Sequence, residues 1–184
     1  TIKIDSLRSD LIKNFSFYIS KKKNFKIVHV SNFGQRQANR LYNISIAKKI
    51  SNGLIRNGHD VVNISDRDIV RLNRGIKNIS KGFDYLNNLL IETLDNYKPD
   101  AIILGHVNNI NEKTLEIIKN KNKNIKITQW FEDNLSKNGP DPIANKRNFL
   151  KYLEYIDQSF VTTDPKTLKL DKKLFLKLKL KFQL

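Results

Sequence analysis

Polar residues that could do chemistry follow several apolar segments of the chain. His106 comes directly after Gly105, near the end of the run that spans residues 100–107. An imidazole in this place can donate a hydrogen bond or act as a general base, because the reference pKa of histidine lies near neutrality. It can equally be a hydrogen-bonded polar residue at a strand end, and the sequence leaves both interpretations open.

A second group of such residues, Trp130, Glu132 and Asp133, closes the apolar segment 125–130. It could supply a base and a stacking surface for a sugar or a nucleobase. In the alternative interpretation, Trp130 closes the core and the two carboxylates cap the next turn. Because adjacent side chains rarely face the same point, we expect at most one catalytic carboxylate. We choose Asp133 for that role and Glu132 for substrate binding.

The loop of residues 32–43 is a third candidate, and it carries Asn32, Gly34, Gln35, Arg36 and Arg40. Arginines between a strand and a helix could meet phosphate or sugar hydroxyls, together with the helix N-terminus. A single glycine does not make a dinucleotide fingerprint, and the P-loop pattern is absent from the sequence. Solvated surface arginines and a simple turn glycine would give the same pattern.

The sequence predicts no metal centre and no bound cofactor. There is no Cys, and the three His (His29, His59 and His106) are scattered without H-x-x-x-H spacing. We interpret His29, inside a β-branched run, as a core residue and His59 as a turn residue.

Alternating strands and helices are expected to position these side chains. Short apolar runs predict strands, and apolar residues at three- and four-residue spacing predict helices. The strands are expected at residues 26–31, 60–65, 100–107, 125–130 and 158–163. The helices are expected at residues 5–20, 43–58, 83–97, 111–119 and 141–157, with Asp141 as N-cap and Pro142 at N1.

This order indicates an α/β fold, a Rossmann-like parallel sheet of about five strands with helices on both faces. The run 100–107 has no polar alternation, which is typical of a central strand. Ligands bind outside the carboxyl ends of such a sheet, where the strand order reverses. If the second and third strands flank the first, the loops after the first and third strands line the crevice.

Net charge at first suggests a nucleic-acid partner. The chain of 184 residues carries a formal charge of +16, but it holds 26 Lys against 8 Arg. Lysine lacks the planar fork with which arginine reads bases and phosphates. Residues 1–25 carry +4 and residues 166–184 carry +6. We therefore predict that nucleic acid is not the partner.

Neither a membrane span nor a signal peptide is expected from the sequence. The apolar runs fall far short of the roughly 20 residues that a bilayer requires, and the first 25 residues contain no apolar signal core. Cytoplasm is the default location, and the oligomeric state is left open.

We divide the chain into a helical extension (1–25), a Rossmann-like domain (26–165) and a basic Lys/Leu tail (166–184). The tail could form an edge strand or a truncated basic end. The start at Thr1 and the stop within a Lys/Leu alternation suggest a fragment of a longer protein.

Residues 26–165 resemble the N-terminal half of CgeB-like glycosyltransferases, bacterial proteins of the GT-B class. The resemblance rests on HVSNFGQRQANRLYNISIAKKISNGLIRNGHDVVNISDRD, KPDAIILGHV, TQWFEDNLSKNGPDP and FVTTDP. It implies the acceptor-side domain of an enzyme that transfers a sugar from a nucleotide-sugar donor. The donor-binding half that the resemblance implies has no counterpart after Asp164, so we expect the fragment to be inactive alone.

On this interpretation His106 or Asp133 removes the acceptor proton without a metal ion, and the arginines orient an anionic acceptor or the donor pyrophosphate. Asn32, Gly34, Gln35 and Trp130 would face the same cleft. The alternative is a non-catalytic, flavodoxin-like binding module for nucleic acid or an acidic partner. That module would need aromatic and arginine residues interleaved along a basic face, and residues 166–184 contain no Arg.

Overall fold

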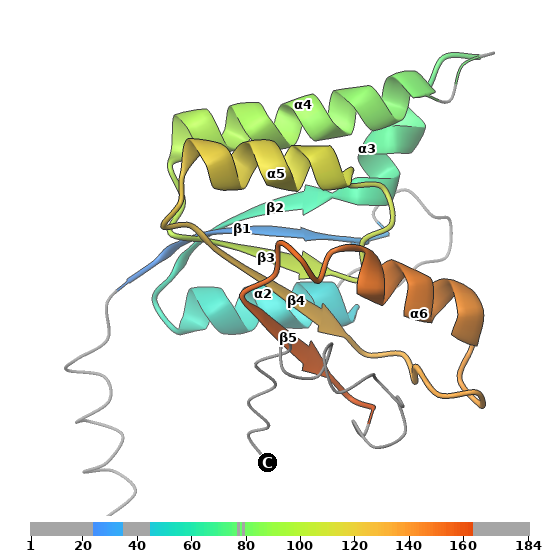
Figure 1. The fold of residues 1–184 in the computed structure, drawn as a ribbon. Helices are drawn as coiled ribbons and strands as arrows, with labels where there is room; N and C mark the ends of the chain where they lie inside the picture. Colours follow the sequence, from blue (N-terminus) through green and yellow to red (C-terminus); the bar gives the residue numbers. More distant parts are fainter. Residues whose placement is uncertain (1–23, 35–44, 77, 79, 164–184) are drawn as a thin grey trace, which may run out of the picture.

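The fold is a five-stranded parallel sheet with helices around it (Figure 1). The computed structural model describes residues 24–34, 45–76, 78 and 80–163. The strands are β1 (Lys26–Ser31), β2 (Asp60–Ser65), β3 (Ala101–Gly105), β4 (Lys126–Phe131) and β5 (Gln158–Val161). Their order in the sheet is β2-β1-β3-β4-β5, the flavodoxin-like arrangement.

All four neighbouring pairs are parallel, and β1 is flanked by β2 and β3. Val28 lies opposite Val62 on one side and Ile102 on the other. The strand order therefore reverses beside β1, as the predicted crevice requires. The predicted central strand is also confirmed, since β3 is the middle strand and Ile102 and Leu104 in it are almost fully buried.

Helices connect successive strands. They are α2 (Ile46–Arg56), α3 (Asp66–Asn73), α4 (Ser80–Tyr97), α5 (Glu112–Lys121) and α6 (Pro142–Lys151). Local sequence signals explain their ends. The Ser45 side chain caps α2 by accepting from the Lys48 N–H, and the Asp141 side chain caps α6 by accepting from the Ala144 N–H. The predicted N-cap and N1 proline of α6 are thus confirmed.

The sheet separates two apolar layers. Figure 1 shows α3, α4 and α5 on one side of the sheet and α2 on the other. Val28, Val30 and Leu104 pack with Leu86 and Leu90 of α4 in the larger cluster. A smaller cluster contains Phe33, Ala47 and Trp130, with Ile50 of α2 and Ile103 of β3 against it. Burial of these side chains is the main force that holds the layers together.

Several predicted boundaries are wrong. The run Asp66–Asn73, for which the sequence predicts no helix, forms α3, whose first turn carries the favourable carboxylates Asp66 and Asp68. The last helix was expected to reach residue 157, but α6 ends at Lys151. Leu153 and Ile156 still pack on the core from positions beyond the helix end, so their spacing imitates a helix.

The predicted helix at 5–20 and the tail at 166–184 lie outside the described residues. Within the part of the chain that the structure describes, no helix has the length and apolar character needed to cross a membrane.

Candidate functional site

A polar cavity of about 460 Å³ lies at the carboxyl end of the sheet. It is lined by the ends of β1, β3 and β4 and by the first residues of α2 and α3. The lining residues are Ser31, Asn32, Ser45, Ile46, Ala47, Arg67, Gly105, His106, Trp130, Glu132 and Asp133. The cavity therefore lies at the predicted reversal of strand order, and it holds most of the described residues that the sequence singled out.

His106 leaves the end of β3 in a left-handed backbone conformation, with φ of 50°. This conformation is uncommon for residues other than glycine, although histidine adopts it more readily than most. The imidazole stacks on the Phe131 ring, with 4.2 Å between the ring centroids. Backbone and ring stacking together turn His106 toward the end of β4.

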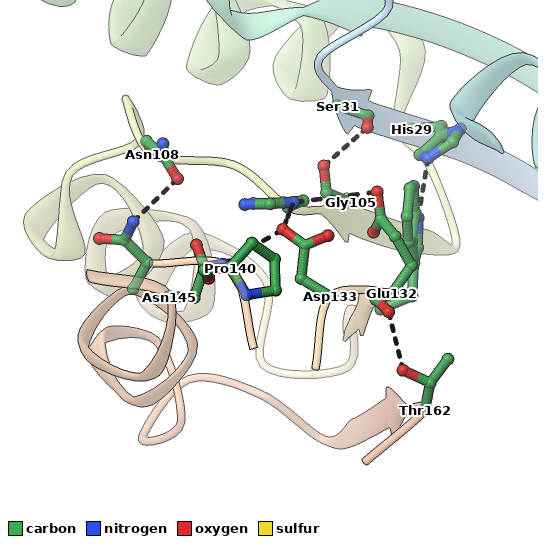
Figure 2. Close-up of polar contacts among 12 residues, drawn as sticks. His29, Ser31, Gly105, Asn108, Glu132, Asp133, Pro140, Asn145 and Thr162 are labelled. Atoms are coloured by element: carbon green, nitrogen blue, oxygen red, sulfur yellow. Dashed lines mark hydrogen bonds and ion pairs between the residues drawn. The ribbon is translucent and has the colours of Figure 1, made fainter. Parts of the chain in front are cut away.

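Both carboxylates that follow β4 face the His106 imidazole. His106 Nδ1 lies 3.8 Å from Glu132 Oε1 and 3.6 Å from Asp133 Oδ2. Figure 2 shows the Glu132 and Asp133 side chains next to each other beside the end of β3. The expectation that the two adjacent side chains point apart is wrong here. Strand alternation no longer applies, because β4 ends at Phe131.

Neighbouring elements contact the Asp133 carboxylate and the Glu132 main chain (Figure 2). Asn145 of α6 donates from Nδ2 to Asp133 Oδ2 at 3.2 Å and to the Pro140 carbonyl at 2.7 Å. Thr162, after β5, donates its hydroxyl to the Glu132 carbonyl at 2.8 Å. The Glu132 Oε2 atom is buried and has no hydrogen-bond partner among the described residues.

Beneath the cavity, His29 and Trp130 form a buried hydrogen-bonded chain. The Trp130 indole donates to His29 Nε2 at 3.1 Å, so Nε2 carries no proton and Nδ1 carries one. The Nδ1–H group then donates to Ser51 Oγ at 2.7 Å, and Ser51 donates to Asn63 Oδ1. Burial lowers the pKa of His29 to about 4. Its prediction as a core residue agrees with its complete burial.

Trp130 closes part of the core, as one of its two interpretations states, and its use as a stacking surface stays a prediction. It belongs to the core cluster with Phe33, is 8% exposed, and gives its N–H to His29. It also lines the cavity beside Gly105. The indole lies so close to Gly105 that a Cβ there would fall 2.3 Å from the ring. The glycine thus makes room for this wall of the cavity.

The sequence interpretation missed Arg67, at the start of α3, which brings a cation to the cavity. Its position directly after a strand end is the signal that could have found it. The neighbouring Asp66 carboxylate is buried and accepts from the Asn108 N–H and the Asn109 side chain, both at 3.3 Å. Burial raises the pKa of Asp66, although these hydrogen bonds oppose the rise. Asp66 thus connects α3 to the loop that begins with His106.

The first predicted loop is only partly described. Asn32 lines the cavity. Gly34 is buried and has φ of 65°, which favours its interpretation as a turn residue. Gln35, Arg36 and Arg40 lie outside the described residues, so their predicted roles stay predictions.

The described residues include one group of side chains that could hold a metal ion. His106, Glu132 and Asp133 each offer one ligand atom, and these atoms lie within 4.8 Å of one another. Sequence spacing predicted no such group, because His106 follows β3 whereas the two carboxylates follow β4, and they meet only when these strands pair.

Fold and site together define an α/β protein with an open parallel sheet and a polar cavity where the strand order reverses. No protein-family model matches the chain. A search of curated proteins finds no match either.

Proposed function

We propose that this domain is the acceptor-side half of a GT-B glycosyltransferase, which moves a sugar from a nucleotide-sugar donor to an acceptor hydroxyl. The observation that carries the proposal is the imidazole of His106, whose Nδ1 atom faces two carboxylates in a cavity at the sheet's reversal point. The resemblance of residues 26–165 to CgeB-like proteins supports the same class of reaction. A cytoplasmic location is part of this proposal.

The proposed chemistry is removal of a proton from the acceptor hydroxyl as its oxygen attacks the sugar. A C–O bond forms at the anomeric carbon, and the bond to the nucleotide diphosphate breaks. The proton passes to His106 or to Asp133, and the carboxylates stabilise an imidazolium if His106 takes it. Asn145 and the Phe131 ring are positioning residues, since they orient Asp133 and His106.

The cavity also contains groups that suit an anionic ligand. Arg67 lies there, together with the N-terminus of α2, whose first turn contains no acidic residue. Unpaired N–H groups and the helix dipole both favour negative charge at such an end. A phosphate of the donor or an anionic acceptor would therefore be held in the cavity by these groups.

A variant of α2 tests the use of the cavity in transfer. Ile46 is 46% exposed and lines the cavity, whereas Ile55 on the same helix is 51% exposed and lies outside its lining. The protein from the complete reading frame is assayed for nucleotide release from a panel of nucleotide sugars, with sugar acceptors added. Ile46→Trp is expected to lower release at least about tenfold by filling the cavity, and Ile55→Trp to leave it unchanged. Equal activity of the two variants would refute the cavity as the acceptor site, and no release from any donor would refute the transferase.

A second candidate function is favoured by a different surface. A groove of about 1210 Å³ runs along α6, and its described lining contains no acidic residue. The groove is lined by apolar side chains and by four cations, namely Lys137, Lys146, Arg147 and Lys151. This charge favours a non-catalytic binding module for an acidic protein partner. Titration with a single-stranded oligonucleotide at low and high salt tests nucleic acid as the partner instead. Binding at low salt that weakens steeply with salt would indicate phosphate recognition, and no binding at low salt would exclude nucleic acid.

A further inference from the structure

Three metal-ligating side chains meet at the mouth of the cavity without bonding to one another. The separations of His106 Nδ1 from Glu132 Oε1 and Asp133 Oδ2, 3.8 and 3.6 Å, exceed normal hydrogen-bond lengths. Their side chains are 17%, 31% and 32% exposed, so solvent ions can reach them. All three side chains line the cavity, and the His106 Nδ1 atom faces an oxygen of each carboxylate.

The spacing of the three donor atoms matches a transition-metal ion. Bonds of about 2.1 Å to imidazole nitrogen and carboxylate oxygen place neighbouring ligands of a tetrahedral ion about 3.4 Å apart. The two separations from His106 Nδ1 are within a few tenths of an ångström of that value, and all three donor atoms lie within 4.8 Å of one another. Small side-chain rotations would therefore complete the geometry without moving the strands.

Outer contacts orient the donors as they do around known metal ligands. Asn145 donates to the same Asp133 oxygen that faces His106, and the Phe131 ring fixes the imidazole plane. The buried Glu132 Oε2 atom lacks a hydrogen-bond partner among the residues that the structure describes. A divalent cation would balance the charges of the two carboxylates. It would also give the Glu132 Oε2 atom an electrostatic partner.

We propose that His106, Glu132 and Asp133 bind one divalent transition-metal ion, Zn²⁺ or Mn²⁺, with an open coordination position toward the cavity. Imidazole and carboxylate together suit these ions. The inference does not rest on sugar transfer, since binding is measured without substrate. A cation at the site would occupy the Nδ1 lone pair of His106 and an oxygen of Asp133, so the metal-bound cluster would not take the acceptor proton at those atoms.

Calorimetric titration of the chelator-treated full chain with Zn²⁺ and with Mn²⁺ tests the site. We expect one equivalent to bind, and the variants His106→Ala and Asp133→Asn to weaken binding at least about tenfold. The matched controls are His59→Ala and Asp95→Asn, which change the same residue types away from the cavity. Unchanged affinity in the cluster variants, or equal loss in the controls, would overturn the proposal.

A measurement on the unaltered protein guards against variants that fail to fold. Imidazole NMR signals of the three histidines are followed during the Zn²⁺ titration. A shift confined to His106 supports the site. A shift of His59 or His29 instead, or no shift at all, would overturn the proposed metal site.

Discussion

The His29 imidazole is kept neutral by burial. Burial lowers its pKa to about 4, against about 6.5 in the unfolded chain. The unfolded state therefore binds more protons between these values, so stability falls as the pH drops from 6.5 to 4. The full effect is about 3 kcal/mol.

His29→Gln removes this titration. We expect the free energy of unfolding of the variant to depend less on pH between 4 and 6.5 than that of the parent. Urea unfolding at several pH values measures the difference. Asp66, whose raised pKa acts in the opposite sense, is common to both proteins and cancels. Parallel curves for the two proteins would show that His29 titrates normally in the fold.

Gly105 is needed for the close approach of Trp130. A Cβ at Gly105 would lie 2.3 Å from the indole, whereas a Cβ at Gly53 in α2 meets nothing within 4 Å. We expect Gly105→Ala to destabilise by about 1–3 kcal/mol through overpacking. Gly53→Ala should instead stabilise by about 0.5–1 kcal/mol, because alanine favours the helix.

Tryptophan fluorescence reports directly on the packing of the indole in Gly105→Ala, because Trp130 is the one tryptophan of the chain. The emission of Gly105→Ala should shift to the red as the indole loses its buried place beside His29. An unshifted spectrum together with unchanged stability would contradict the packing described for this wall of the cavity.

At the scale of elements, Asp157 joins α5 to β4 just before β5 begins. Its Oδ2 accepts from Lys119 Nζ at 2.6 Å and from the Ile127 N–H at 2.8 Å. Partial burial raises the pKa of Asp157, but these donors outweigh it and hold the pKa below the usual value of 3.8. The stabilisation is thus present above about pH 4 and is lost as the pH falls through the lowered pKa.

Asp157→Asn should cost about 1–2 kcal/mol at neutral pH, since it weakens hydrogen bonds to a charged acceptor. The control is Asp95→Asn, which breaks an exposed ion pair with Lys121 and should cost less than about 0.5 kcal/mol. Chemical unfolding at neutral and acid pH measures both. If Asp157→Asn lowered the free energy of unfolding by the same amount in acid as at neutral pH, the carboxylate charge would not be the source of the loss.

Elements that bury whole apolar faces were predictable from the sequence. The strands β1 and β2 have the expected bounds, and β3 lies at the centre as its unbroken apolar run indicates. The short α3 was not predictable, because its eight residues contain too few apolar positions to reveal a period. The end of α6 was mispredicted because Leu153 and Ile156 pack on the core from residues beyond the helix end.

At the scale of the whole molecule, the cavity could be located but its side chains could not be oriented. Topology placed His106, Trp130 and Asp133 at one edge of the sheet, as observed. The convergence of Glu132 and Asp133 on one imidazole depends on how the chain turns after β4 and on Asn145 of α6. Such contacts between distant segments leave no periodic pattern in the sequence.

The most direct test of the proposed function is the turnover number of the complete protein with His106→Ala, Asp133→Asn and both changes together. Loss of a positioned proton acceptor should lower kcat at least about 100-fold for each single variant. The double variant should be little slower than either single one, because the two residues act as one unit. Single variants that keep the parent kcat would contradict the assignment of the cluster to proton transfer.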